Sequence, residues 1–206
     1  MSLNIVHARL EGVARFAALV GGLGIIVIAV MVTMDVLLRK FFNTTLGGAT
    51  EMSGFIFAIG TALSYPYVLF DRANIRIDVV YSLVSSRIRA GLDLLALLLL
   101  LYFVSMLTLS VAGVFVKSWE GNSMSIGVVN VRLWIPQLFW MIGYVLFSAT
   151  ALLLTVFAVA ALVRRDYATV NRVAGVPSVE ETIEEETYIT PDHPAESTRP
   201  EDEEKH

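Results

Sequence analysis

The chain has 206 residues, of which 56% are hydrophobic, and a formal net charge of −4, whereas soluble domains are nearer about 45–50% apolar. It has no cysteine, which excludes disulfides, thiol nucleophiles and thiolate metal sites. The apolar residues lie in four long segments without a charge, and the last 43 residues are strongly polar. The sequence therefore predicts one membrane domain, residues 1–165, followed by a tail, residues 166–206, with no second large globular domain.

The four charge-free segments predict four transmembrane helices. A helix rises about 1.5 Å per residue, so roughly 20 apolar residues cross a hydrocarbon core of about 30 Å. The segments contain 19, 19, 23 and 31 residues, at 16–34, 52–70, 94–116 and 133–163. We therefore expect an all-α membrane protein with spans at about 16–38, 52–70, 94–116 and 134–163. The first segment exceeds a secretory core of about 7–15 residues and no small-residue cleavage site follows, which favours a retained helix over a signal peptide.

The distribution of Lys and Arg predicts the orientation, because these residues collect on the cytoplasmic side. Nine of them precede the first span, lie between the second and third spans, or follow the fourth closely, and four lie in the other two connections. Both termini are therefore expected in the cytoplasm.

Two acids flank the first connection, residues 40–51, whose Asn43-Thr44-Thr45 and Gly47-Gly48 are typical of turns. Asp35 precedes Arg39 by four residues, so the two side chains can pair along the helix. Glu51 opens the second span, where a helix N-terminus favours negative charge. We favour this interfacial interpretation of both acids over an ion pathway.

Small residues form rows at helical spacing along the first two spans: Ala17 and Gly21, then Gly54, Ala58 and Ala62. Such rows permit close approach of helices in lipid, either within the chain or with a partner. Pro66 is expected to kink or end the second span near its inner end.

The second connection, residues 71–93, carries Arg72, Arg76, Asp78, Arg87 and Arg89. Its apolar residues share faces at helical spacing: Ile75, Val79 and Leu83 on one, and Val80, Val84 and Ile88 on another. This pattern predicts a short amphipathic helix on the membrane surface, in contact with lipid and broken near residues 85–86. A basic loop that only sets the topology is an equally good interpretation.

The third connection, residues 117–132, has a turn signal at Gly121-Asn122 and then an apolar patch: Ile126, Val128, Val129 and Val131. We expect this patch to dip into the membrane interface or to press against another protein. Trp134 and Pro136 open the fourth span, where proline is tolerated in the first turn and tryptophan favours the interface. The span is long for an upright crossing and would tilt.

The tail has eleven acidic residues between positions 180 and 204, and four prolines interrupt it. Like charges at helical spacing oppose a helix. We expect a disordered cytoplasmic tail.

The sequence offers little catalytic chemistry. Its three histidines, His7, His193 and His206, lie outside the predicted spans, where they cannot serve as axial haem ligands or as the base of an intramembrane Ser-His protease. No phosphate loop or metal-ligand cluster is present, and the predicted span interiors lack the charges that a channel or autonomous carrier usually has. We expect no enzyme activity, no cofactor and no nucleic-acid partner.

Four segments taken in order resemble the small membrane subunit of a TRAP transporter, the DctQ-like family, over roughly residues 12–165. They are residues 35–42, 50–52, 74–78 and 134–136. The chain departs from the family at Gly48-Ala49-Thr50, where a tryptophan and a second acid are common, and at Asn74, where histidine is common.

The resemblance implies a tripartite system in the cytoplasmic membrane of a bacterium or archaeon. A periplasmic solute-binding protein would capture an organic acid or related solute. A large TRAP membrane subunit would carry the sodium sites and move the solute by an elevator motion, and the small subunit would be a static scaffold. Two alternatives are a self-contained oligomeric channel or carrier, and a membrane anchor of an unrelated complex.

None of the candidate residues is expected to bind sodium or substrate. They are expected to position the subunit or its partner contacts: Arg39, Glu51, Gly54, Ala58, Ala62, Arg72, Arg76, Asp78, Trp134 and Pro136.

Overall fold

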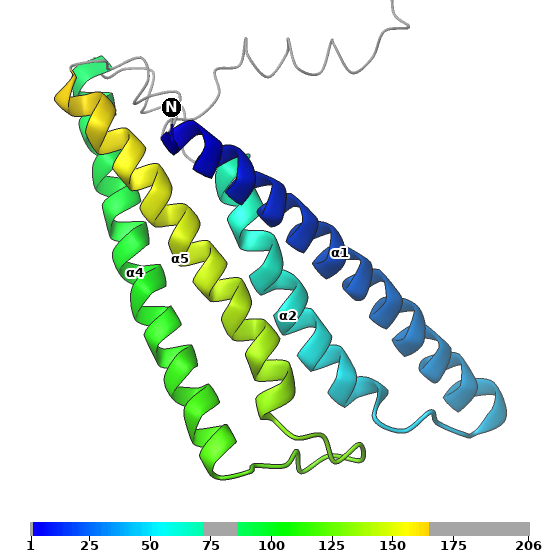
Figure 1. Cartoon of the computed structure of the whole chain (residues 1–206). Coiled ribbons are helices and arrows are strands. Elements are labelled where there is room, and N and C mark those ends of the chain that lie inside the picture. The colour runs from blue at the N-terminus through cyan, green and yellow to red at the C-terminus, as the bar shows by residue number, and fades with distance from the viewer. Residues whose placement is uncertain (1, 72–85, 165–206) are drawn as a thin grey trace, which may run out of the picture. The chain divides into compact units, whose positions relative to one another are not determined.

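The computed structural model describes residues 2–71 and 86–164. It contains four long helices: α1 (Ser2–Phe42), α2 (Ala49–Phe70), α4 (Ser86–Glu120) and α5 (Trp134–Val163) (Figure 1). The shortest has 22 residues, which at 1.5 Å per residue gives about 33 Å, enough to cross a hydrocarbon core. All four are long and apolar enough to span a membrane, which confirms the four predicted segments.

The helices extend beyond the charge-free segments. Helix α1 begins at Ser2 rather than near residue 16, and α4 begins at Ser86 rather than near residue 94. The difference arises because an apolar run marks the part of a helix suited to hydrocarbon, whereas backbone hydrogen bonds can continue the helix past it. Helix α2 runs through the buried Pro66 to Phe70, so proline does not end it.

Two expectations fall largely outside the described residues. The proposed amphipathic helix involves residues 72–85, although its last part, from Ser86 onward, is the start of α4. The tail from residue 165 onward is also outside the described range, so its expected disorder stays a prediction.

The helices pack in an order that differs from the order of the chain. Helix α2 packs against both α1 and α5, and α4 packs against α5. A cluster of buried residues joins α2, α4 and α5: Leu69, Leu97, Ala151, Leu154 and Ala158. Many large apolar side chains remain exposed on the outer faces, including Leu19 on α1 and Leu109 on α4. That distribution suits helices surrounded by lipid or by other membrane helices.

Close packing depends on two glycine contacts. A Cβ added to Gly21 would lie 2.8 Å from the carbonyl oxygen of Gly60, so α1 and α2 touch through their backbones. A Cβ added to Gly143 would lie 2.7 Å from the carbonyl carbon of Ala62, which brings α5 equally close to α2. Such contacts are a main source of helix association in lipid.

Polar contacts join α4 to α5. The Thr108 hydroxyl lies 2.7 Å from Ser148 Oγ and donates to the Tyr144 carbonyl at 3.2 Å, in addition to its own-helix contact with Val104 O. These are bonds between residues 36 and 40 positions apart, and no spacing rule in the sequence predicts them.

Replacing Thr108 by valine, which preserves the side-chain shape, should lower the free energy of unfolding by about 1 kcal/mol, because the interhelical bonds are lost. Thermal unfolding of the purified chain in mild detergent measures this. Ser110→Ala is the matched control, since the exposed Ser110 hydroxyl bonds only to Met106 O of its own helix among the contacts described. Equal losses in the two variants would contradict an interhelical role.

Candidate functional site at the loop end of the helices

The two described connections meet at one end of the helices, which we call the loop end (Figure 1). The first is the loop 43–48, between α1 and α2, and the second is the hairpin 121–133, between α4 and α5. Two acidic side chains, Asp35 and Glu51, organise these connections.

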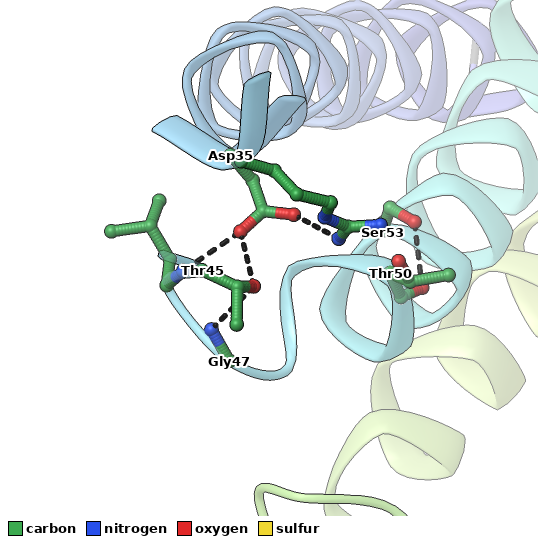
Figure 2. Close-up of polar contacts among 7 residues, drawn as sticks. Asp35, Thr45, Gly47, Thr50 and Ser53 are labelled. Atoms are coloured by element: carbon green, nitrogen blue, oxygen red, sulfur yellow. Dashed lines mark hydrogen bonds and ion pairs between the residues drawn. The ribbon is translucent and has the colours of Figure 1, made fainter. Parts of the chain in front are cut away.

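Asp35 ties the last turns of α1 to the loop that follows (Figure 2). Its Oδ1 accepts hydrogen bonds from Thr45 Oγ1 and from the Leu46 backbone N–H, both at 2.7 Å, and its Oδ2 accepts from Arg39 Nη2 at 2.6 Å. The Thr45 hydroxyl in turn accepts a bond from Gly47 N at 3.3 Å. The predicted pair between Asp35 and Arg39 is confirmed. The bonds to the loop were not anticipated.

Asp35 is buried within the chain and is only 3% exposed. The loop supplies the hydrogen bonds that a buried carboxylate requires. Asn43, Gly47 and Gly48 all have positive φ, which lets a six-residue loop fold back over the helix end.

The connection between α4 and α5 is a short hairpin. Ser125 N donates to Val131 O at 2.8 Å and Leu133 N donates to Ser123 O at 3.0 Å, on either side of a bridge between Met124 and Arg132. The predicted turn at Gly121-Asn122 is present, with Asn122 at φ 44°.

Glu51 binds this hairpin from the first turn of α2. Its Oε1 accepts a hydrogen bond from Ser125 Oγ, and its Oε2 accepts one from Val129 N at 3.3 Å. A Cβ added to Gly127 would overlap the Glu51 carboxylate, so the hairpin backbone lies directly on that group. The position of Glu51 at the helix start was predicted, and its link to the hairpin was missed.

Aromatic residues flank the hairpin on both sides. The rings of Trp119 and Trp134 meet edge to face with centroids 4.8 Å apart. Pro136 lies in the first turn of α5, as expected, and is buried. Tryptophan at a helix end is typical of the boundary between membrane and water.

The other candidate residues have different surroundings. The Arg39 side chain bonds to Asp35 and is 62% exposed. Ala62 is buried against Gly143, and Ala58 is half-buried beside Pro136. Gly54 is exposed, and a Cβ added there would meet no atom within 4 Å. Arg72, Arg76 and Asp78 lie outside the described residues.

Two polar residues that the sequence analysis placed outside the predicted spans lie within the long helices. His7 belongs to α1, and its ring contacts those of Phe70 and Phe157 at 5.1 and 5.6 Å. Asp93 is fully buried in α4. Both fall inside candidate spans, Ile5–Phe42 and Ile88–Glu120, because the helices extend beyond the apolar runs. Over the part of the chain that the structure describes, no group of three or more His, Cys, Asp or Glu residues is placed to hold a metal ion.

Four apolar helices in close contact, with organised connections at one end, define a multi-pass α-helical membrane protein. Residues 28–167 match the family model described as "Tripartite ATP-independent periplasmic transporters, DctQ component". The chain belongs to this family, and it is therefore the small permease component of a tripartite transporter rather than an enzyme. The match confirms the resemblance found in the sequence. No match was found among curated proteins or among solved structures.

Proposed function

We propose that this chain is the static scaffold of its transporter and supports a large, elevator-type membrane subunit that carries the sodium sites. The imported solutes would be organic acids or related compounds, as the resemblance implies. The observation that carries the scaffold role is the backbone contact of α2 with both of its neighbours, through Gly60 and Ala62. Helices locked at backbone distance cannot slide without breaking these contacts, which is the property a fixed frame requires.

We propose that both termini face the cytoplasm and that the loop end faces the periplasm of a bacterial or archaeal cell. The support is the excess of Lys and Arg in the N-terminal segment, the second connection and the segment after α5. The loop end carries fewer basic residues: Arg39, Lys40, Lys117 and Arg132.

We further propose two protein contacts, besides lipid. The large subunit would pack on the open groove between α1 and α2, whose lining includes Ile28, Gly54 and Phe57. The solute-binding protein would dock transiently at the hairpin, where Ile126 is 105% and Val128 is 77% exposed. Apolar side chains this exposed at a connection outside the helices suit an intermittent partner.

Reconstitution tests the proposed function. The large subunit is reconstituted in vesicles, solute-binding protein is added outside, and an inward sodium gradient is imposed. These vesicles should take up solute only when this chain is also present. Without it, uptake should fall to the level of protein-free vesicles. The chain should also copurify with the large subunit in mild detergent.

Two results would contradict the proposal. One is full uptake by the large subunit without this chain, which would remove the scaffold role. The other is solute flux through vesicles that contain this chain alone, which would indicate a self-contained channel or carrier.

A further inference from the structure

We propose that Glu51 is a positioning residue, which fastens the hairpin 121–133 to the first turn of α2 and so fixes Ile126 and Val128 as the contact surface for the solute-binding protein. This inference rests on the proposed function and adds the residue that holds the docking surface in place.

The contacts of the hairpin alternate along residues 125–129. Ser125 and Val129 donate to the Glu51 carboxylate, and Gly127 lies directly against it. The residues between them, Ile126 and Val128, are 105% and 77% exposed, whereas Val129 is 39% exposed. Residues 126 and 127 form a bend and residues 128 and 129 a turn at the tip of the hairpin. One carboxylate therefore holds the backbone of the hairpin tip and leaves the side chains of Ile126 and Val128 exposed.

A favourable interaction with the helix N-terminus would explain an acid at position 51 without any hairpin contact. It does not explain why both carboxylate oxygens bind residues 74 and 78 positions later in the chain. A carboxylate that accepts a backbone N–H bond and a hydroxyl bond forms charge-assisted bonds, which are stronger than neutral ones. These bonds tie two separate connections together.

The hairpin also rests on the loop 43–48. A Cβ added to Gly48 would overlap Val129 Cγ2, and one added to Gly47 would lie 3.6 Å from Val128 Cγ1. Asp35, on α1, holds the same loop through its bonds to Thr45 and Leu46. Asp35 and Glu51 thus fix neighbouring parts of one surface, and a surface fixed before binding loses less conformational freedom when the partner arrives.

The main test compares Glu51→Ala and Ser125→Ala with Glu120→Gln, which changes an exposed acid at the end of α4. In the reconstituted transporter, uptake is measured against the concentration of solute-binding protein. Glu51→Ala should raise the half-saturating concentration by about tenfold, equivalent to about 1.4 kcal/mol, and leave the maximal rate unchanged. Ser125→Ala should raise it less, and Glu120→Gln should not change it.

A spin label gives a second readout that does not depend on uptake. The chain has no cysteine, so the single substitution Ile126→Cys allows selective labelling at this exposed position. The label should be more mobile in Glu51→Ala than in the parent. A depth measurement with a lipid-soluble relaxing agent should find it in water, because the proposal places the hairpin tip against a soluble partner.

Gly127 supplies an internal control. Gly127→Ala places a methyl group on the Glu51 carboxylate, so it should displace the hairpin and raise the half-saturating concentration in the parent chain. In the Glu51→Ala background the added methyl group no longer meets a carboxylate. Gly127→Ala should then raise the half-saturating concentration only slightly further. Equal effects of Gly127→Ala in both backgrounds would contradict the direct contact.

The proposal is overturned if Glu51→Ala and Ser125→Ala leave both the half-saturating concentration and the label mobility unchanged. It is also overturned if Glu51→Ala lowers only the maximal rate, or if the label at position 126 lies in lipid. Failure of the proposed function itself would give a different result. In that case the parent chain would not copurify with the large subunit and would not be required for uptake.

Discussion

Replacing Gly60 by alanine should lower the free energy of unfolding of the isolated chain by about 1–3 kcal/mol, and replacing it by leucine should separate α1 from α2. An alanine Cβ would lie 2.8 Å from Ile25 Cδ1 and 2.9 Å from the carbonyl oxygen of Gly21. The isoleucine side chain can move, but the backbone of α1 cannot move without loosening the whole contact. Helix α1 packs mainly on α2, and in lipid no hydrophobic effect restores a lost contact.

Gly54 provides the matched control for Gly60 on the same helix. A Cβ at Gly54 meets nothing within 4 Å, so Gly54→Ala should not lower the unfolding temperature of the isolated chain in mild detergent. If Gly54 lies under the large subunit, as proposed, the same variant should weaken copurification instead. A Gly60→Leu variant that unfolds at the parent temperature would show that the α1–α2 contact is not required.

The number and type of the helices could be predicted because one physical requirement governs them. A membrane span needs a run of apolar residues of a certain length, and the four charge-free segments meet that requirement. The ends of the helices could not be predicted in the same way. Helix α1 continues through Arg9, Glu11 and Arg15 toward Ser2, because charged side chains do not interrupt the backbone hydrogen bonds of a helix.

The helix contacts were only partly predictable. Spacing identifies residues that share a helix face, but it does not identify the helix that this face meets. Gly21 was recognised as a small residue suited to close packing, and it does pack against α2. Its partner Gly60 and the contact of Ala62 with Gly143 depend on α2 lying between two neighbours, which a single sequence does not reveal.

The loop end shows the same division between local and distant contacts. The bond of Asp35 to Arg39 follows from a spacing of four residues on one helix. The bonds of Glu51 cross 74 and 78 residues of chain, so no local rule reaches them. Residues 126–129 form a bend and a turn rather than a regular strand, so a two-residue periodicity does not identify the exposed pair either.

Replacing Asp35 by alanine should disrupt the loop 43–48 and lower the unfolding temperature of the isolated chain by several degrees. The variant removes the acceptor for Thr45 Oγ1 and for Leu46 N–H, and it removes the partner of Arg39. Bonds to an ionised carboxylate are charge-assisted and roughly twice as strong as neutral ones, so bonds to water replace them only in part. The hairpin rests on the same loop at Gly48, so its position should change as well.

Two further variants separate the roles of the carboxylate oxygens. Asp35→Asn keeps an oxygen that can accept from Thr45 and Leu46 but loses the ionic bond, and Arg39→Gln loses only the ionic bond. Because the Arg39 side chain is 62% exposed, that bond should contribute at most about 1 kcal/mol. Both variants should therefore unfold closer to the parent than Asp35→Ala does. If Arg39→Gln destabilises the chain as much as Asp35→Ala, the ion pair and not the loop contact holds this end of the protein together.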